Sequence, residues 1–512
     1  MRDFFNYKID KKKDSYSATI QLKNFIENFV SQDQFRVLFE KFKIITSIPD
    51  EVLINKSKKI IFSNFDFNRG KFNKKFSILM IFRDVLFYIW IIFCSIFLSK
   101  KKSDNIKSYQ VILDDVDQES AFAKFKKLLS MTDSYLVILT EEMNINKLKN
   151  VNFMHFNKKK LVFDKDYLLG KKIMFIKFFF FLLFYSLKYR LNFFSIFNII
   201  LFQTLKYETI FSSNNGKYLL IERFWRTCSI KNYIFKKHGG VSSSCLQKNI
   251  LEASISLFID TDVIFTLGSN KNNNKTISDL GGKLTSDIPV GSISMENKWF
   301  LSERDTSKIP NIDLLCLGHN PSTFIEVNDA VKKNYFEHIK WLKNLSLEYP
   351  NLVIYFKHHD YRLRHTNNKG KVVSRSKGFN NLFNKYDSIF AEEQEILHKT
   401  NIITETESAT KNGSYAYVDR SKVVCSFGST MVLEAIGHGK QSFFLDPDFG
   451  NSAIFQNYED YKSLRISNYN DFKNTILECI KNYEVNKIKD TDKYCLQSDK
   501  VTQRIYDYFV KN

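Results

Sequence analysis

The stretch that decides the fold is residues 422–447, KVVCSFGSTMVLEAIGHGKQSFFLDP. It begins with a short apolar, β-prone run, is interrupted by the small-residue turn 426–430, and continues with helix-forming residues at 431–436. Two glycines then end the helix, and a second apolar run follows. The pattern predicts a strand–turn–helix–strand unit with Ser429 or Thr430 at the start of the helix.

A turn of this kind can bind a phosphate. Free backbone N–H groups and the hydroxyls of Ser429 and Thr430 would point toward one place beside Gly428, which favours a bound phosphate or diphosphate. Any strand–helix crossover also needs small residues at its turn. The turn alone therefore leaves a purely structural role open.

A second element upstream favours the phosphate interpretation. Residues 351–360, NLVIYFKHHD, are typical of a buried strand that ends at Lys357, His358 and His359. Ligands of open α/β sheets collect at the carboxyl ends of strands, so cations there suit an anion. Gly318, which follows another predicted strand, is expected at the same edge. Adjacent histidines can also bind metal, but no Cys or carboxylate completes a recognisable ligand spacing, so we expect no metal.

Four stretches resemble the GT-B-fold transferases that build bacterial capsules and other surface carbohydrates, a group that includes capsule-synthesis, polysialyltransferase and CDP-glycerol glycerophosphotransferase-like enzymes. The stretches are Lys237-His238-Gly239; residues 262–268 with 281–282 and 289–292; residues 357–359; and Ser429-Thr430 with Glu434-Ala435 and Gly439-Lys440. The last matches the group's S-T-x-x-x-E-A-x-x-x-G-K pattern. The third stands where the group has Lys-x-His-Pro, with His359 in place of proline. Together they cover under half of the chain.

The resemblance implies a nucleotide-donor site in the C-terminal half. By analogy, Ser429 and Thr430 hold the phosphate or diphosphate of an activated donor, with CMP- or CDP-linked donors favoured through the relatives alone. Lys357 and His358 would neutralise the departing phosphate, because cations stabilise charge that develops in the transition state. Glu434 would reach a ribose hydroxyl or hold the turn. It could equally be a carboxylate placed at a helix start by the helix dipole.

Two positions are candidates for the general base that deprotonates an acceptor hydroxyl. Asp115 lies with Asp114 and Asp117 at the end of a predicted strand. His238 is the rival, although a structural histidine would explain the same position. Residues 260–262, Asp-Thr-Asp, mimic the metal–nucleotide motif of the other major glycosyltransferase fold, but two acids at this spacing are common by chance.

Composition limits the partners. The chain has 512 residues, enough for two domains, and a formal net charge of +21. Lys, Asn, Ile and Phe are abundant, acidic residues are interspersed among the basic ones, and no RNA-binding motif occurs, so we expect no nucleic-acid partner. Seven scattered cysteines without a C-x-x-C pair favour reduced core thiols and the cytoplasm.

Two apolar segments suggest contact with a membrane. Residues 85–98 are shorter than the roughly 20 residues that a spanning helix needs, although a helix that starts at Phe76 could span if Arg83 and Asp84 sat near one face. Residues 173–205 are broken by Lys177, Lys188 and Arg190, which suits a helix that lies in a membrane surface. Buried core helices are the alternative. We expect peripheral attachment at the inner face of a bacterial membrane, and no cleavable signal peptide, because residues 1–14 are polar and charged.

The predicted fold class is α/β, with two Rossmann-like domains facing a cleft (GT-B-like) and apolar helices inserted in the N-terminal half. The expected regions are a helical, membrane-associating segment at 1–104, whose first 75 residues form an appendage; an acceptor domain at 105–300 with the apolar insertion at 171–207; a donor domain at 301–490; and a helix at 491–512 that crosses back to the first domain. Strands are expected at 109–113, 135–140, 218–224, 233–235 and 312–317.

The predicted function is a metal-independent transfer of a sugar or polyol-phosphate unit from a nucleotide-activated donor to a surface-polysaccharide or lipid-linked acceptor. No cofactor besides the donor substrate is expected. A nucleotide-sugar 2-epimerase is the enzymatic alternative, because that chemistry uses the same fold and needs no acceptor. A non-catalytic, membrane-associated assembly factor is the other alternative, and His359 in place of proline is the argument for it.

Overall fold

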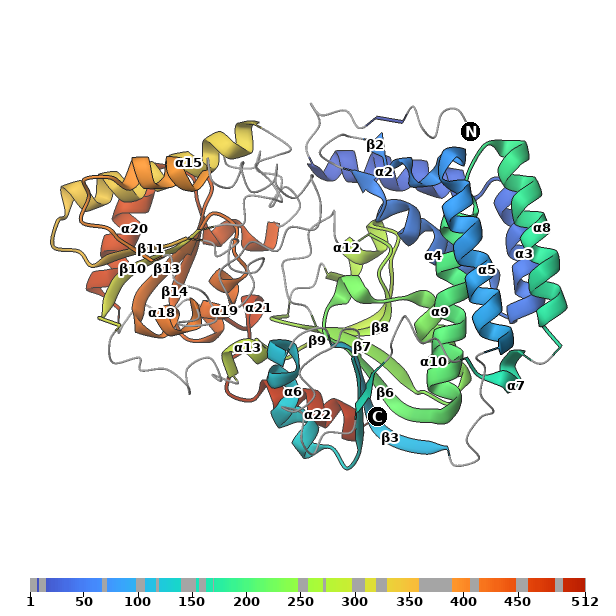
Figure 1. Cartoon of the computed structure of the whole chain (residues 1–512). Helices are drawn as coiled ribbons and strands as arrows, with labels where there is room; N and C mark the ends of the chain where they lie inside the picture. Colours follow the sequence, from blue (N-terminus) through green and yellow to red (C-terminus); the bar gives the residue numbers. More distant parts are fainter. Residues whose placement is uncertain are drawn as a thin grey trace.

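The computed structural model describes residues 7–8, 15–66, 71–97, 106–116, 119–139, 153–155, 163–168, 170–246, 257–269, 273–296, 309–318, 329–358, 389–405, 414–447, 459–483 and 491–511. Within these residues the chain forms two α/β domains, each built on one parallel β-sheet (Figure 1). The carboxyl ends of strands of the N-terminal sheet and Glu434 of the C-terminal domain line one pocket. This is the GT-B-like arrangement predicted from the sequence.

The N-terminal sheet has seven parallel strands in the order β5-β4-β3-β6-β7-β8-β9. They are β3 (Lys107–Val116), β4 (Tyr135–Leu139), β5 (Phe153–His155), β6 (Asn214–Ile221), β7 (Ser242–Leu246), β8 (Asp260–Thr266) and β9 (Lys283–Pro289). The strand order reverses between β3 and β6, which pair directly although a long helical insertion separates them in the sequence. Such a reversal is the topological switch point at which open α/β sheets bind ligands.

Side chains of these strands alternate between two cores. On one face, Val111 and Leu113 of β3 pack in a cluster with Ile505 and Phe509 of the terminal helix α22 (Val501–Lys511), beside α6 (Glu119–Met131). The last helix therefore crosses back to the first domain, as expected. On the other face, Ile112 belongs to a core shared with α9 (Phe194–Ser213) and α10 (Ser229–Lys237).

The first helices of the chain are part of this second core. They are α2 (Ser15–Val30), α3 (Asp33–Thr46), α4 (Asp50–Phe62), α5 (Ile81–Phe97), α7 (Lys165–Leu168) and α8 (Lys172–Tyr189), with a short hairpin of β1 (Phe65–Asp66) and β2 (Lys71–Phe72) and the 3₁₀ turns η1 (Lys74–Phe76) and η2 (Ile78–Met80). The rings of Phe35 and Phe193 lie 5.2 Å apart, and α4 contacts both α9 and α10. The prediction of an N-terminal appendage is therefore wrong for the described residues.

Two more predictions about this domain are wrong. Residues 233–235, expected as a strand, lie in α10, and the strand beside β6 is the less apolar β7. Residues 191–205, expected at a membrane surface, lead into and form much of α9, which is buried along most of its length. Polar side chains there bond internally: Asn192 and Asn198 donate to the carboxylate and the backbone carbonyl of Asp84, at 2.8 and 2.6 Å.

The C-terminal sheet has six parallel strands in the order β12-β11-β10-β13-β14-β15. They are β10 (Ile312–Leu317), β11 (Ile354–Lys357), β12 (Ile403–Glu405), β13 (Ser421–Ser426), β14 (Gln441–Leu445) and β15 (Arg465–Ile466). The predicted strand–turn–helix–strand unit is present as β13, α19 (Met431–Gly437) and β14. Helices α15 (Asp329–Glu348) and α20 (Tyr469–Lys481) pack together, and α18 (Ser414–Arg420) contacts β10 and β13. The switch point of this sheet lies between β10 and β13.

Near residues 495–496 the chain crosses from the C-terminal domain back to the N-terminal domain. The remaining elements are η4 (Phe224–Arg226), α12 (Asn273–Asp279), α13 (Ile293–Glu296), η7 (Glu459–Leu464) and α21 (Thr491–Tyr494). After α21, the backbone N–H of Leu496 donates to the carbonyl of Leu267 in the N-terminal domain at 2.8 Å. The same segment packs on Gly437 of the C-terminal domain, where an added Cβ would lie 2.5 Å from Cys495 Sγ.

Candidate functional site

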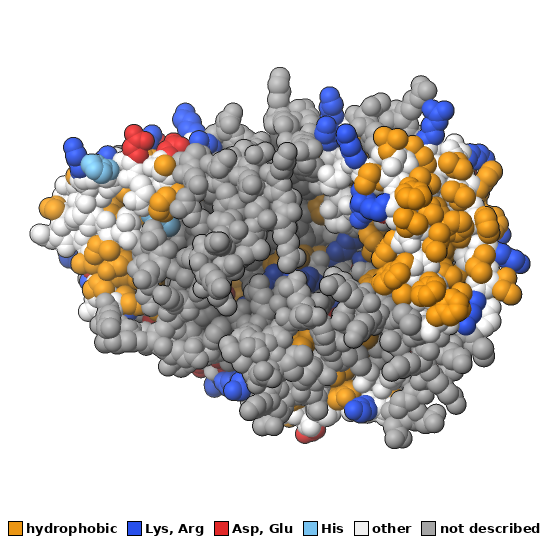
Figure 2. All heavy atoms as spheres, in the orientation of Figure 1, with side chains coloured by type: hydrophobic (Ala, Val, Ile, Leu, Met, Phe, Trp, Pro, Cys, Tyr) orange, Lys and Arg blue, Asp and Glu red, His pale blue; other side chains and the backbone are white. Residues whose placement is uncertain are grey.

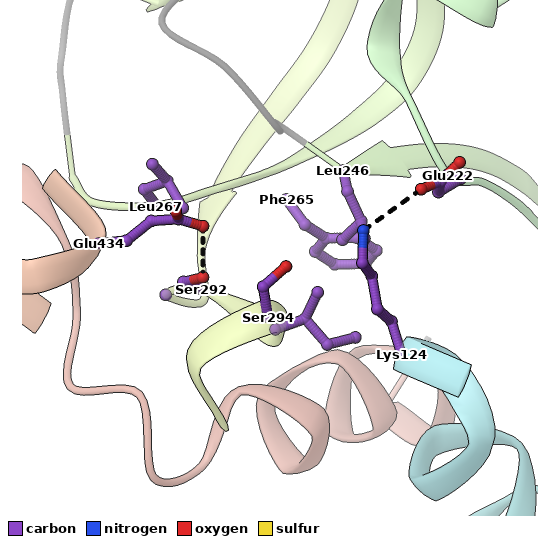
Figure 3. Close-up of a pocket in the computed structure, with 10 residues that line it drawn as sticks. Lys124, Glu222, Leu246, Phe265, Leu267, Ser292, Ser294 and Glu434 are labelled. Carbon is purple, nitrogen blue, oxygen red and sulfur yellow. Dashed lines mark hydrogen bonds and ion pairs between the residues drawn. The ribbon is translucent and has the colours of Figure 1, made fainter. Parts of the chain in front are cut away.

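A small pocket that is partly open to solvent lies between the two domains. Its lining includes residues at or just after the carboxyl ends of N-terminal strands, and one residue of the C-terminal domain, Glu434 (Figure 3). The lining residues are Lys124, Glu222, Leu246, Phe265, Leu267, Gly291, Ser292, Ile293, Ser294 and Glu434. The pocket therefore combines an apolar floor with hydroxyls, one lysine and two carboxylates.

Glu434 bridges the two domains. The hydroxyl of Ser292 donates to Glu434 Oε1 at 2.7 Å, and the hydroxyl of Tyr415 donates to Oε2 at 3.1 Å. Figure 3 shows Glu434 reaching from its helix toward Ser292. Burial, reinforced by the charge of Glu434, raises the pKa of Tyr415 well above its ordinary value, so this phenol remains a donor.

On the N-terminal side, the pocket has a carboxylate that the sequence did not single out. Glu222 follows β6 and lies 3.6 Å from Nζ of Lys124 on α6 and 3.1 Å from Nε of Arg223. Its side chain is almost fully buried. Glu222 stands at the switch point of the N-terminal sheet, and only the direct pairing of β3 with β6 reveals this. No local motif marks the residue.

The turn 426–430 lies at the switch point of the C-terminal sheet. Ser426 Oγ donates to the carbonyl of Leu317 on β10 at 2.8 Å and accepts from the N–H groups of Gly428 and Ser429 at 3.3 and 3.2 Å. Ser429 Oγ accepts from the N–H of Met431 at 3.3 Å. The expectation of free N–H groups is therefore wrong at these three positions. The bonds are long, and the side chains of Ser429 and Thr430 are partly exposed.

Gly318 lies at the same edge but does not offer its N–H to a ligand. That group donates to the carbonyl of Lys357 at 2.8 Å and so joins β10 to the end of β11. The carboxyl ends of β11, β10 and β13 are consecutive in the sheet. The structure therefore brings Lys357 and the turn 426–430 to one edge, with Gly318 between them. His359 lies outside the described residues.

The adjacent side chains of Lys357 and His358 turn to opposite faces of the sheet. Nζ of Lys357 lies 5.5 Å from the ring centroid of Tyr417 on α18. The imidazole of His358 packs on the rings of Phe356 and Phe390 on the other face. This divergence follows from the two-residue period of a strand. The two side chains do not form a single cationic loop.

His358 is held by a carboxylate that sequence reasoning missed. Its Nδ1 lies 2.5 Å from Glu393 Oε2, its Nε2 lies 2.6 Å from Nε2 of Gln394, and the hydroxyl of Tyr335 donates to Glu393 Oε1. A carboxylate only accepts hydrogen bonds, so Nδ1 carries the proton and Nε2 accepts from the Gln394 amide. No motif marks Glu393, because it meets His358 only through the fold.

Aromatic rings connect this network to the turn. Tyr335 contacts Phe427 of the turn edge to face, at 5.7 Å between ring centroids, and His338 stacks on the same ring at 5.5 Å. His338 is fully buried, and burial lowers its pKa to about 3, against partial compensation by nearby backbone carbonyls. It is therefore a neutral core residue at physiological pH.

His238 lies away from the pocket. It follows α10, and Val241 beyond it bonds the carbonyl of Lys217 near the start of β6, whereas the pocket is lined at the strands' carboxyl ends. Its Nε2 lies 2.8 Å from Glu208 Oε2, and Lys237 donates to Oε1. Burial pushes the pKa of Glu208 upward, but these two partners outweigh it and hold the pKa below its ordinary value. The geometry favours a structural role for His238 over a role as general base.

The remaining acidic candidates lie in different places relative to the pocket. Asp114 is fully buried, pairs with Lys231 at 2.6 Å and, unlike Glu222, is not among the residues that line the pocket. Asp115 lies in β3 at the switch point, but its side chain is outside the described set, as is Asp117. Asp260 and Asp262 lie at the start of β8, away from the pocket, where Asp262 bonds Lys236 and Ser243. Among the described residues, no cluster of His, Cys, Asp or Glu could hold a metal ion.

Comparison with known proteins finds only distant structural similarity. No protein-family model and no curated protein sequence matches this chain. Among solved structures, UDP-GlcNAc 2-epimerase from Neisseria meningitidis, bound to UDP-GlcNAc, has 10% identity and a TM-score of 0.45, covering 79% of this chain and 100% of that one. The epimerase from Methanocaldococcus jannaschii has 9% identity and a TM-score of 0.43, with 79% and 100% coverage. The wall teichoic acid polymerase TagF (variant H548A) has 12% identity and a TM-score of 0.41, with 85% and 98% coverage. Scores this low do not discriminate between an epimerase and a polymerase.

Proposed function

We propose that this chain is a metal-independent GT-B-type transferase that moves a sugar or polyol-phosphate unit from a nucleotide-activated donor to a surface-polysaccharide or lipid-linked acceptor. The observation that carries the proposal is the position of the turn 426–430. It lies at the switch point of the C-terminal sheet, where open α/β sheets bind their ligands. The switch point of the N-terminal sheet contributes Glu222 to the interdomain pocket.

In this proposal the donor phosphate binds beside the hydroxyls of Ser429 and Thr430. The long bonds within the turn are the ones that a phosphate would replace, because charge-assisted hydrogen bonds to phosphate oxygens are stronger than neutral ones. Lys357, two strands away at the same edge, supplies positive charge as the leaving phosphate departs. His358 fixes the end of β11 through Glu393. CMP- or CDP-linked donors remain favoured by the sequence resemblance alone.

On the acceptor side, Glu222 takes the place of His238 in the proposal. A general base must come within hydrogen-bond reach of the acceptor hydroxyl, and Glu222 lies in the pocket whereas His238 does not. Asp115, at the end of the neighbouring strand, is the other proposed base. Glu434 would exchange its bonds to Ser292 and Tyr415 for a donor ribose hydroxyl.

Two other functions fit the same fold. A 2-epimerase would interconvert a nucleotide-sugar without any acceptor, and a non-catalytic assembly factor would not release nucleotide at all. The polar N-terminal side of the pocket, which carries Glu222 and Lys124, supports a transferase, because an epimerase has no second substrate to place there.

The test is a product assay with candidate CMP-, CDP-, UDP- and GDP-linked donors, each with and without membrane lipid extract as acceptor. We expect nucleotide release that depends on the acceptor and falls by at least about 100-fold in Lys357→Ala, since such electrostatic groups contribute on that order. Donor conversion in the absence of acceptor would favour the epimerase. Absence of both reactions with every donor would favour the assembly factor.

A further inference from the structure

We propose that the outer faces of α5 and α8 form a docking surface that lies flat on an anionic phospholipid bilayer. This surface goes beyond the proposed transferase and does not depend on it. Most of the exposed large apolar side chains among the described residues lie on these two helices. A concentration of this kind differs from the scattered apolar residues that are normal on soluble surfaces.

Each helix contributes a row of aromatic and aliphatic side chains. On α5 these are Phe82, Leu86, Phe87, Ile89, Phe93 and Phe97. On α8 they are Ile173, Ile176, Phe180, Phe181, Phe184 and Leu187. Their exposed fractions run from 38% for Phe87 to 72% for Phe82. The helices contact each other, and Figure 2 shows apolar side chains gathered over the part of the N-terminal domain where Figure 1 places them.

The inner sides of the helices are fixed to the protein. By length and composition, Ile78–Phe97 could cross a membrane. The hydroxyl of Tyr88 on α5, however, donates to the carbonyl of Phe175 on α8 at 2.8 Å, and Asp84 is buried against Asn192 and paired with Arg83. Insertion of α5 across a bilayer would break these bonds and bring a carboxylate into hydrocarbon, which is costly. The helix therefore exposes one apolar side to the membrane surface and keeps the other on the protein.

The exposed charges beside this surface are basic, which favours an anionic membrane as its partner. The exposed charged side chains on α5 and α8 are all basic, Arg83, Lys177 and Lys188, since Asp84 is the sole acidic residue of the two helices and is buried. Nζ of Lys188 lies 5.8 Å from the ring of Phe184, so the cation stands beside the apolar row. Each basic residue near an anionic membrane surface adds about 1 kcal/mol to binding.

A second copy of the chain fits this surface less well than lipid does. A two-fold interface places the same patch of both subunits in contact. Such an interface would bring Lys177 and Lys188 toward equivalent lysines, with no exposed acid on either helix to compensate. An interfacial helix pair with an apolar side and a basic margin is instead suited to the boundary between headgroups and acyl chains.

The experiment is co-sedimentation of the full chain, without nucleotide, with vesicles of phosphatidylcholine alone or mixed with phosphatidylglycerol. We expect binding to the mixed vesicles that weakens with salt. The triple variant Phe93→Ser/Phe180→Ser/Phe184→Ser should bind at least about tenfold more weakly, because it removes three apolar side chains from the interface. Its matched control is Val241→Ser/Leu347→Ser/Val510→Ser, which changes similarly exposed residues elsewhere and should bind as the parent does.

A second pair of variants keeps the apolar rows intact. Lys177→Gln/Lys188→Gln should lose about fivefold in affinity per lysine on mixed vesicles only, and Lys126→Gln/Lys333→Gln, at exposed lysines of other helices, should lose little. Unchanged binding of the triple variant would overturn the proposal. If the chain forms a dimer without vesicles and the triple variant is monomeric, the surface binds a second copy instead of lipid. If the bound chain resists alkaline extraction, α5 spans the membrane. The assay needs no donor, so its failure is separate from a failure of the proposed function.

Discussion

The imidazole of His358 and the carboxylate of Glu393 form a buried pair at the carboxyl end of β11, with 2.5 Å between Nδ1 and Oε2. Tyr335 bonds the other carboxylate oxygen and also contacts Phe427, so the pair is continuous with the turn that carries Ser429. The two loops that the sequence identified separately are thus held at one edge by residues that neither motif contains.

Replacement of Glu393 tests this connection. Glu393→Gln keeps the volume but removes the carboxylate that fixes the His358 tautomer, so we expect transfer to fall at least about tenfold. The control is Glu392→Gln, which removes only a partly exposed partner of Lys332 and should change activity less than about twofold. Initial rates of nucleotide release measure both. Equal activity of the two variants would exclude a role of the pair in turnover.

The buried imidazole of His338 predicts a pH dependence of stability. Its pKa is about 3 in the folded chain, against an unfolded value near 6.5. Between these values the unfolded chain binds a proton that the folded chain does not, so this group lowers the free energy of unfolding as pH falls below about 6.5, by about 1.4 kcal/mol per pH unit. Urea unfolding of His338→Phe should therefore show a shallower loss of stability between about pH 6.5 and 5 than the parent.

The control for this experiment is His398→Gln, because His398 is exposed. It should follow the parent curve. If His338→Phe and the parent lose stability in parallel as the pH falls, the imidazole is not held neutral by burial.

The crossing at Gly437 predicts a steric effect on domain association. An added Cβ would lie 2.5 Å from Cys495 Sγ and 2.7 Å from the carbonyl oxygen of Leu496, so Gly437→Ala must displace the segment that leads to α22. We expect a loss of about 2 kcal/mol or more, which is typical of overpacking. Gly439→Ala meets no atom within 4 Å and is strained only by its φ of +79°, so it should cost about 1 kcal/mol. If Gly439→Ala lowers the melting temperature more than Gly437→Ala does, the close packing of residues 495–496 on Gly437 is contradicted.

The hydrogen bond from Ser292 to Glu434 joins the two domains, so its loss should affect both the melting temperature and the distance between the domains. Ser292→Ala removes a 2.7 Å bond between the domains, and Tyr415→Phe removes a bond to the same carboxylate from within the C-terminal domain. Bonds to charged groups are worth about 1.5–3 kcal/mol, so both variants should melt at a lower temperature. Small-angle scattering should show a larger radius of gyration for Ser292→Ala alone. An equal increase in both would assign Glu434 a role within one domain.

Local sequence predicted the C-terminal domain well. The run 422–447 contains a complete strand–turn–helix–strand unit. Its small-residue turn and its two glycines predict the boundaries of β13, α19 and β14 to within about two residues. The same reasoning located Lys357 and Ser429 at the ends of strands that the structure places at one edge.

Other features depend on tertiary contacts that no local pattern carries. Residues 242–246, SSSCL, lack an apolar alternation. They nevertheless form a strand, because β6 and β8 on either side provide parallel backbone hydrogen-bond partners. Residues 191–205 look like a surface helix until Asn192 and Asn198 are seen to bond Asp84 within the core. Glu222 and Glu393 reach the site only because the fold brings distant strands and helices together. The opposite orientations of Lys357 and His358, by contrast, follow from the two-residue period of the predicted strand.

The most direct test of the central claim is calorimetric titration of the chain with CMP, CDP, UDP and GDP, repeated on Ser429→Ala/Thr430→Ala. We expect at least one nucleotide to bind the parent. The double variant should bind it at least about tenfold more weakly, because two hydroxyls at the switch point contact its phosphate. Equal affinity of the double variant and the parent, or no binding of any of the four by the parent, would contradict this claim.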